Sequence, residues 1–236
     1  MKLIRTSATA IVAMLVSVFT FGQTAEEIVA KHVEAIGGAA AWKKVNSIFY
    51  EGKMTVQNAE VNVTLTVLNG KGVRQNISFG GMTGYQIITP TAGWNFMPFQ
   101  GQATAEAMTA DELKQSADDL DVQGKLIDYK SKGNTVEYLG KDDVEGTECF
   151  KLKITSKAGN VETVFVDPKS YYIVRSVSKK TANGQENDVQ TDLSNYQKLP
   201  EGIVVPFSIK LSDGELVITK AEVNKQVDES TFKPSN

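Results

Sequence analysis

Most of this chain consists of short segments in which apolar and polar residues alternate with a period of two. Such alternation predicts β-strands that bury one face and expose the other. Gly, Asn and Asp turns separate the segments, and Asn69-Gly70 is a hairpin signal. About eleven strands are expected between residues 46 and 223, enough for one strongly curved antiparallel sheet or a barrel.

The alternation is interrupted once, between residues 93 and 120. Two large aromatic residues, Trp94 and Phe96, are followed by a helical segment that begins at Thr109. Thr109 and Glu112 have the spacing of a capping box, in which each side chain binds a free backbone N–H at the helix start. A single helix inside an antiparallel sheet must lie against one face of it. The helix therefore covers either an ordinary core or an apolar cavity.

A second capping box, formed by Thr24 and Glu27, predicts a helix near the N-terminus. Apolar residues and His32 recur along one side of this helix at helical spacing. Gly37-Gly38 ends it, because glycine readily takes the left-handed backbone conformation that closes a helix. The expected fold class is mainly β (α+β), with an N-terminal helix and a mid-chain helix against one sheet.

Residues 1–22 have the parts of a secretory signal peptide, with Lys2 and Arg5 ahead of an apolar run. Cleavage is expected near Gly22 and Gln23, which leaves residues 23–236 as a single exported domain. No cysteine lies near this point, so no N-terminal lipid anchor is expected. The formal net charge is −3 and basic runs are short, which argues against binding nucleic acid or an anionic bilayer by charge.

Residue types that commonly carry catalysis are sparse. His32 is the only histidine and Cys149 the only cysteine. We interpret His32 as a satisfied interface residue of the first helix and Cys149 as a small strand residue. No nucleophile-elbow, phosphate-loop or EF-hand motif occurs. We therefore expect no enzyme, no cofactor and no metal, although the sequence does not place paired Asp or Glu side chains of a hydrolase in space.

Apolar side chains exceed what a single strand–helix junction needs. They either form the core beneath the helices or line a concavity sized for an acyl chain. Burying such a chain stabilises a complex by roughly 0.8 kcal/mol per CH2, so binding requires no catalytic group. The candidate lining residues are Ile48, Tyr50, Val63, Leu65, Ile77, Phe79, Trp94, Phe96, Phe99 and Met108.

Several stretches resemble the LolA/LolB-like family of periplasmic lipoprotein-sorting carriers, in the forms common among Bacteroidetes. They are AEEIVAKHVEAIGGAAAWKKVNSI (Ala25–Ile48), GWNFMP (Gly93–Pro98), VEYLGKDDVEGTECFKLKI (Val136–Ile154), VFVDPKSYYIVR (Val164–Arg175) and VNKQVDESTFKP (Val223–Pro234). The resemblance implies a half-open antiparallel barrel whose open side is plugged by helices. The family's carriers also use an arginine inside the barrel as a latch; here Arg74 falls on the polar side of its strand, and no residue is assigned to that role.

The resemblance further implies a soluble periplasmic carrier that holds the acyl chains of lipoproteins or lipids and moves them towards the outer membrane. Its expected partners are an acylated lipoprotein or lipid, an inner-membrane release complex and an outer-membrane acceptor, with the carrier itself a monomer. The first helix and the segment Ala103–Leu120 would act as lids. The alternative is a non-catalytic envelope sensor or assembly factor of the same fold that binds a protein partner.

Overall fold

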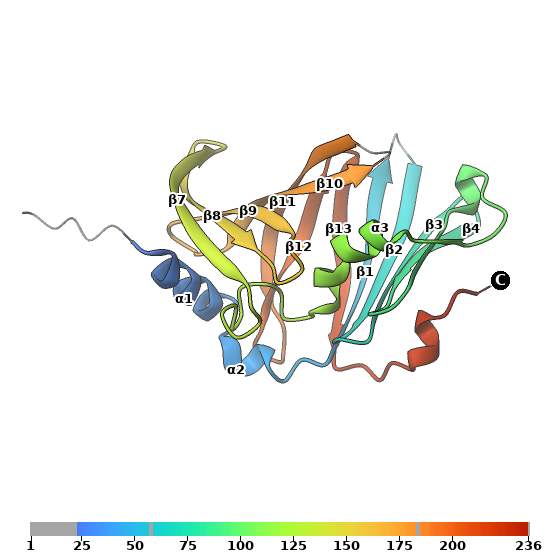
Figure 1. Cartoon of the computed structure of the whole chain (residues 1–236), viewed down its shortest axis with the longest axis horizontal. Coiled ribbons are helices and arrows are strands. Elements are labelled where there is room, and N and C mark those ends of the chain that lie inside the picture. Colours follow the sequence, from blue (N-terminus) through green and yellow to red (C-terminus); the bar gives the residue numbers. More distant parts are fainter. Residues whose placement is uncertain (1–22, 57–58, 183–184, 236) are drawn as a thin grey trace, which may run out of the picture.

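A computed structural model of the chain describes residues 23–56, 59–182 and 185–235. Within them, thirteen strands form a single antiparallel sheet in the order β6-β5-β4-β3-β2-β1-β13-β12-β11-β10-β9-β8-β7. The sheet curves strongly, and its two edge strands, β6 and β7, do not pair with each other, so the barrel stays half open (Figure 1). The expected fold class is confirmed. The sheet has thirteen strands where about eleven were expected, and one of the additional strands is β6, which has only two residues.

The elements follow one another with short turns. The helices are α1 (Ala25–Ala35), α2 (Ala39–Trp42) and α3 (Ala110–Gln115), and the 3-10 turns are η1 (Pro98–Gln100), η2 (Ala117–Leu120) and η3 (Glu229–Phe232). The strands are β1 (Ser47–Val56), β2 (Ala59–Leu68), β3 (Gly72–Phe79), β4 (Met82–Ile88), β5 (Gly93–Phe96), β6 (Glu106–Ala107), β7 (Thr135–Val144), β8 (Thr147–Thr155), β9 (Val161–Val166), β10 (Ile173–Ala182), β11 (Gln185–Lys198), β12 (Val204–Leu211) and β13 (Gly214–Val223).

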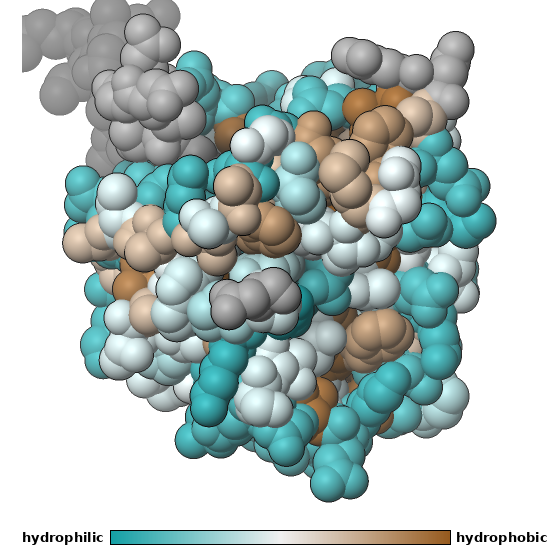
Figure 2. Space-filling view, turned by 90° about the vertical axis from the view of Figure 1, so that its right-hand side faces the viewer, coloured by the Kyte–Doolittle hydropathy of each residue, from teal (hydrophilic) through white to brown (hydrophobic). Residues whose placement is uncertain are grey.

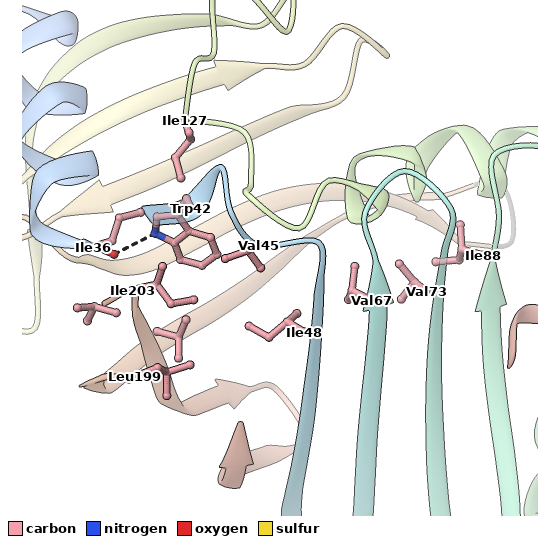
Figure 3. Close-up of a cluster of buried hydrophobic side chains, with 12 residues drawn as sticks. Ile36, Trp42, Val45, Ile48, Val67, Val73, Ile88, Ile127, Leu199 and Ile203 are labelled. Carbon is pink, nitrogen blue, oxygen red and sulfur yellow. Dashed lines mark hydrogen bonds between the residues drawn. The ribbon is translucent and has the colours of Figure 1, made fainter. Parts of the chain in front are cut away.

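One face of the sheet, here called the inner face, is the one on which α1 and α3 pack. The register places its residues in rows that cross the strands. The lowest row consists of Ile48, Val67, Val73 and Ile88, which are paired across β1 to β4 and all buried. Figure 3 shows these four side chains in line beside Trp42 and Val45, which close the lower end of the barrel.

Helix α1 packs on the inner face of β8 and β9. Both halves of its predicted capping box are present, because Thr24 accepts from Glu27 N and Glu27 accepts from Thr24 N. Its apolar side places Ile28 against a cluster that includes Leu152 and Val164, all three buried. The helix thereby fills the inner face of this half of the barrel.

The chain leaves α1 through Gly37, whose φ of +107° is left-handed. A Cβ atom at this position would lie 2.3 Å from the carbonyl oxygen of Gly202, so only glycine fits. The turn brings the Trp42 indole within 2.9 Å of the Ile36 carbonyl, to which its Nε1–H donates (Figure 3). That bond satisfies the one polar group that Trp42 buries.

The mid-chain segment from η1 to η2 crosses the inner face in front of the sheet (Figure 1). The predicted capping box at Thr109 and Glu112 is present and opens α3. Leu113 and Leu120 pack on the buried core beneath the segment. Asn160, in the β8–β9 turn, donates to the Lys114 carbonyl at 3.2 Å and so ties the segment to the far side of the barrel.

The C-terminal segment lies on the opposite, outer face. Phe232 of η3 is buried against the backbone of Gly72 in β3. Arg74 is on this face, as alternation predicted, and donates to the carbonyls of Thr231 and Lys233 at 3.1 and 3.3 Å. The outer face of β3 and β4 is therefore covered by the chain's own end.

Edge strand β7 carries a bulge. Tyr138 pairs with Leu152 and Lys141 with Phe150, so β7 has one residue more than β8 between these pairs. Gly140 has a φ of +96° within this bulge. Leu139 beside it is exposed.

The expected signal peptide, residues 1–22, lies outside the described residues. In the part of the chain that the structure describes, no helix combines the length and apolar character needed to cross a membrane.

Candidate functional site

An open cavity of about 650 Å³ lies at the upper end of the half-barrel, where the β1, β2, β3, β12 and β13 strand ends and η1 meet. We call it the mouth cavity. Its volume falls within the range typical of small-molecule sites. It is lined by Met54, Val56, Ala59, Val61, Val63, Gln75, Ile77, Phe79, Phe99, Gln100, Leu211, Asp213 and Leu216.

The rim of the mouth cavity is apolar and partly exposed. Phe79 is 40% exposed, and Met82, in the same hairpin, is 44% exposed. The Phe99 ring packs edge-on against Phe79, with ring centroids 6.2 Å apart. The view onto the right-hand side of Figure 1 shows hydrophobic residues near the upper end of the molecule and in separate patches lower down (Figure 2). A hydrocarbon chain that enters there would contact mainly apolar side chains.

A smaller cavity of about 130 Å³ lies next to the mouth cavity, on the side of the closed end. We call it the inner pocket. The two cavities share Val63, Gln75 and Leu216, so they are adjacent. The inner pocket is further lined by Tyr50, Leu65, Pro206, Ile209 and Ile218. Below it, the row that begins with Ile48 is packed solid by α2, α3 and η2.

The structure divides the ten predicted lining residues among four places. Val63, Ile77, Phe79 and Phe99 line the mouth cavity. Tyr50 and Leu65 line the inner pocket, together with Val63. Ile48 and Met108 belong to the closed core below.

Trp94 and Phe96 are placed differently from expectation and do not line the concavity. Trp94 pairs with Ile87 and Phe96 with Tyr85, and those β4 residues face outwards. Both aromatics pack in a separate outer cluster that includes Phe232. The reason is parity: strand side chains alternate between faces, and Gly93 and Asn95 hold the inward positions of β5.

Sequence reasoning missed several lining residues. Leu211 and Leu216 come from the far end of the chain and reach the mouth cavity only because β13 pairs with β1. That pairing has no local sequence signal. Gln75 was also missed, because a polar residue among apolar neighbours breaks the alternation that identifies an apolar face. Its position between Val73 and Ile77 was the available signal.

Another interior cavity, of about 360 Å³, lies between α1 and the 118–127 segment and is lined by both charged and apolar side chains. His32 is buried there, and its Nδ1–H donates to the Tyr171 carbonyl at 2.8 Å. Burial lowers the pKa of His32 and outweighs the opposing effect of this bond, so the ring is neutral near pH 7. Lys125 forms an ion pair with Glu162 and lies 3.9 Å from Asp118. These charges are paired and tie the segment to β9.

A further cavity, of about 370 Å³, is a groove on the outer face lined by charged and apolar side chains. Arg175 donates from Nη2 to Asp192 at 3.1 Å, and its hydrogen bonds hold the pKa of the Asp192 carboxyl below its usual value. Cys149 is fully buried beside Phe165, and burial raises the pKa of its thiol. In the described residues no three His, Cys, Asp or Glu side chains are grouped to hold a metal ion. The mouth cavity and inner pocket remain the site best suited to a ligand.

Comparison with known proteins finds similar folds among solved structures. No protein-family model and no curated protein matches the sequence. Among solved structures, a LolA superfamily protein from Nitrosomonas europaea matches with a TM-score of 0.56 and 11% identity, over 90% of this chain and 98% of that one. A putative outer membrane lipoprotein-sorting protein domain from Vibrio parahaemolyticus matches with a TM-score of 0.51 and 13% identity, over 87% and 94%.

A DUF1329 family protein from Desulfovibrio piger matches with a TM-score of 0.54 and 12% identity, over 90% of this chain and 98% of that one. All three likenesses extend over nearly the whole described part of the chain. They show that the chain has the same fold as these three proteins.

Proposed function

We propose that this chain, which shares its fold with a LolA superfamily protein, is a periplasmic carrier that holds the acyl chains of lipoproteins or lipids for transfer towards the outer membrane. One observation carries the proposal. The half-barrel is packed solid at its lower end but keeps an open, apolar cavity of about 650 Å³ at its upper end. Protein interiors are normally close-packed, so a space of this size with an apolar lining is suited to a hydrocarbon ligand.

The energetics agree with such a role. Each buried CH2 group contributes roughly 0.8 kcal/mol, so a long chain binds tightly by burial alone. Release then requires another protein or surface that offers the same burial. An inner-membrane release complex would deliver the acyl chain to the carrier, and an outer-membrane acceptor would take it over.

The test begins with residues 23–236 purified gently from an exporting host, followed by native mass spectrometry and lipid extraction. A bound acylated peptide or lipid is the expected result, and uptake of a fluorescent fatty-acyl probe should follow once the cavity is emptied. An apo mass together with no uptake would contradict the proposal. Recovery of one stoichiometric protein partner with an empty cavity would favour the envelope sensor or assembly factor instead.

A pair of neighbouring substitutions gives the matched control. Ile77→Asp places a charge in the mouth cavity, whereas Ser78→Asp places the same charge on the opposite face of β3. We expect Ile77→Asp to abolish probe uptake and Ser78→Asp to retain it, with both variants folded by circular dichroism. Equal uptake by the two folded variants would show that the probe binds elsewhere.

A further inference from the structure

The inner face contains one row with three polar side chains and one leucine, between two apolar rows; we call it the polar row. Tyr50, Leu65, Gln75 and Gln86 are paired across β1 to β4. The row below is the buried one that begins with Ile48, and the row above contains Val63 and Ile77. The polar row therefore forms the floor on which a ligand from the mouth cavity would end.

Two members of this row have no partner. Gln86 donates from Nε2 to Asn95 Oδ1 at 3.0 Å and is satisfied. The Tyr50 hydroxyl and the Gln75 carboxamide make no hydrogen bond to any residue in ranges 23–56, 59–182 and 185–235. Both line the inner pocket, whose volume of about 130 Å³ brings them to one small space. Both side chains are half-buried and have no partner among the described residues, so their polar atoms can bind a ligand that enters the pocket.

The chemistry of the two groups limits what they can bind. Burial raises the pKa of the Tyr50 phenol, so it remains a neutral hydrogen-bond donor at every physiological pH. The Gln75 amide is also neutral and donates from Nε2. A carbonyl oxygen has two lone pairs and can accept from both. The apolar chain attached to that carbonyl would extend through the mouth cavity.

The lining also discriminates against an anion. Among the described lining residues of the two cavities there is no lysine, arginine or histidine, and the one charged side chain is that of Asp213 at the mouth. A carboxylate in the inner pocket would lose its hydration without gaining a positive partner. A plain hydrocarbon would leave both polar groups desolvated and unpaired, which costs more than a hydrogen bond contributes.

We infer that Tyr50 and Gln75 form a specificity site that selects ligands with an uncharged acyl carbonyl, an ester or amide, over free carboxylates and over plain hydrocarbons. The inference rests on the proposed function, since it concerns the ligand of the same cavity. It identifies the ligand as an esterified or amide-linked acyl chain whose carbonyl reaches the inner pocket.

The test uses residues 23–236 and three probes of equal chain length, methyl dodecanoate, dodecanoate and dodecane. Each competes with N-phenyl-1-naphthylamine, a neutral fluorescent dye, at pH 8. We expect methyl dodecanoate to bind tightest. Gln75→Leu and Tyr50→Phe should each weaken methyl dodecanoate roughly tenfold, the value of one lost hydrogen bond, and leave dodecane equal or tighter.

The control variant is Thr64→Val. Its hydroxyl is on the outer side of β2, where it accepts from Asn76 at 3.0 Å, so its loss should change no affinity. Equal binding of ester and hydrocarbon, or an ester affinity unchanged in Gln75→Leu and Tyr50→Phe, would overturn the inference while leaving the carrier function intact. Tighter binding of dodecanoate than of its ester would also overturn it. If neither the dye nor any of the three probes binds, the proposed function itself fails.

Discussion

The contact between Phe232 and Gly72 leads to a quantitative prediction about the C-terminal segment. The Phe232 ring is 3% exposed, and it lies so close to the Gly72 backbone that a Cβ at residue 72 would be 2.3 to 2.6 Å from three ring atoms. The Gly72 backbone is held on both sides. Gly72 pairs with Leu68 of β2, and its neighbour Val73 pairs with Ile88 of β4, so the backbone cannot move away from the ring. A methyl group at residue 72 must therefore expel the ring.

The magnitudes follow from the two kinds of change. Phe232→Ala removes a buried aromatic ring and should lower the free energy of unfolding by about 3 kcal/mol, the low end for such truncations because a chain end can detach locally. Gly72→Ala overpacks the same site and should cost about 1–3 kcal/mol. In the double variant the new methyl group occupies space that the ring has left. The double variant should therefore be no less stable than Phe232→Ala alone.

Urea unfolding of residues 23–236, followed by tryptophan fluorescence, measures these values by linear extrapolation. Trp94 lies in the same outer cluster as Phe232 and reports on the site. The expected coupling energy between the two substitutions is about 1–3 kcal/mol. Additive effects would refute the reasoning, because they would mean that residue 72 and the ring do not compete for one space.

Three further predictions concern the inner face. Burial lowers the pKa of His32 below its value of about 6.5 in the unfolded chain, so the unfolded chain binds a proton more readily than the folded protein. The free energy of unfolding is therefore highest above about pH 6.5 and falls as the pH drops from there through the pKa of the folded state. In His32→Gln the urea midpoint should no longer fall between pH 7 and 5.5 as it does in the parent protein. If the midpoint falls equally in both proteins, the loss of stability comes from other groups. Leu152→Ala, at a fully buried site, should cost about 2–5 kcal/mol of unfolding free energy, and a smaller value would mean that α1 collapses onto the gap. Thr109→Ala removes the α3 cap at a cost of about 1 kcal/mol and should speed exchange of the Glu112 amide proton; slow exchange would show that the segment is held by its core contacts alone.

Local patterns in the sequence predicted local structure well. Both capping boxes, at Thr24 and Thr109, are present, and the alternation correctly placed Val63 and Ile77 on the inner face. Arg74 was correctly assigned to the outer face by the same argument. Each of these depends on contacts within one strand or one helical turn, where the residue sequence itself sets the geometry.

The prediction failed where distant segments decide the environment. Trp94 and Phe96 were assigned to the cavity because large aromatics near a helix suggest a lining, but their burial is provided by the C-terminal segment around Phe232. The lining contributed by Leu216 depends on the pairing of β13 with β1, which no local pattern encodes. Gln75 interrupts the apolar alternation of β3, and only the pairing of β3 with its neighbours shows that it lines the inner pocket.

The bulge at Gly140 has a consequence for how the protein behaves at high concentration. β7 is a long edge strand with the exposed Leu139 at its middle, and an edge of this kind is normally a template on which other chains add and aggregate. A left-handed residue at the centre of the strand twists the edge, so that a straight strand cannot follow it for more than a few residues. Replacing Gly140 with a β-branched residue would strain the turn and favour a flatter edge. Solubility at high concentration would then depend on one glycine that lines neither the mouth cavity nor the inner pocket.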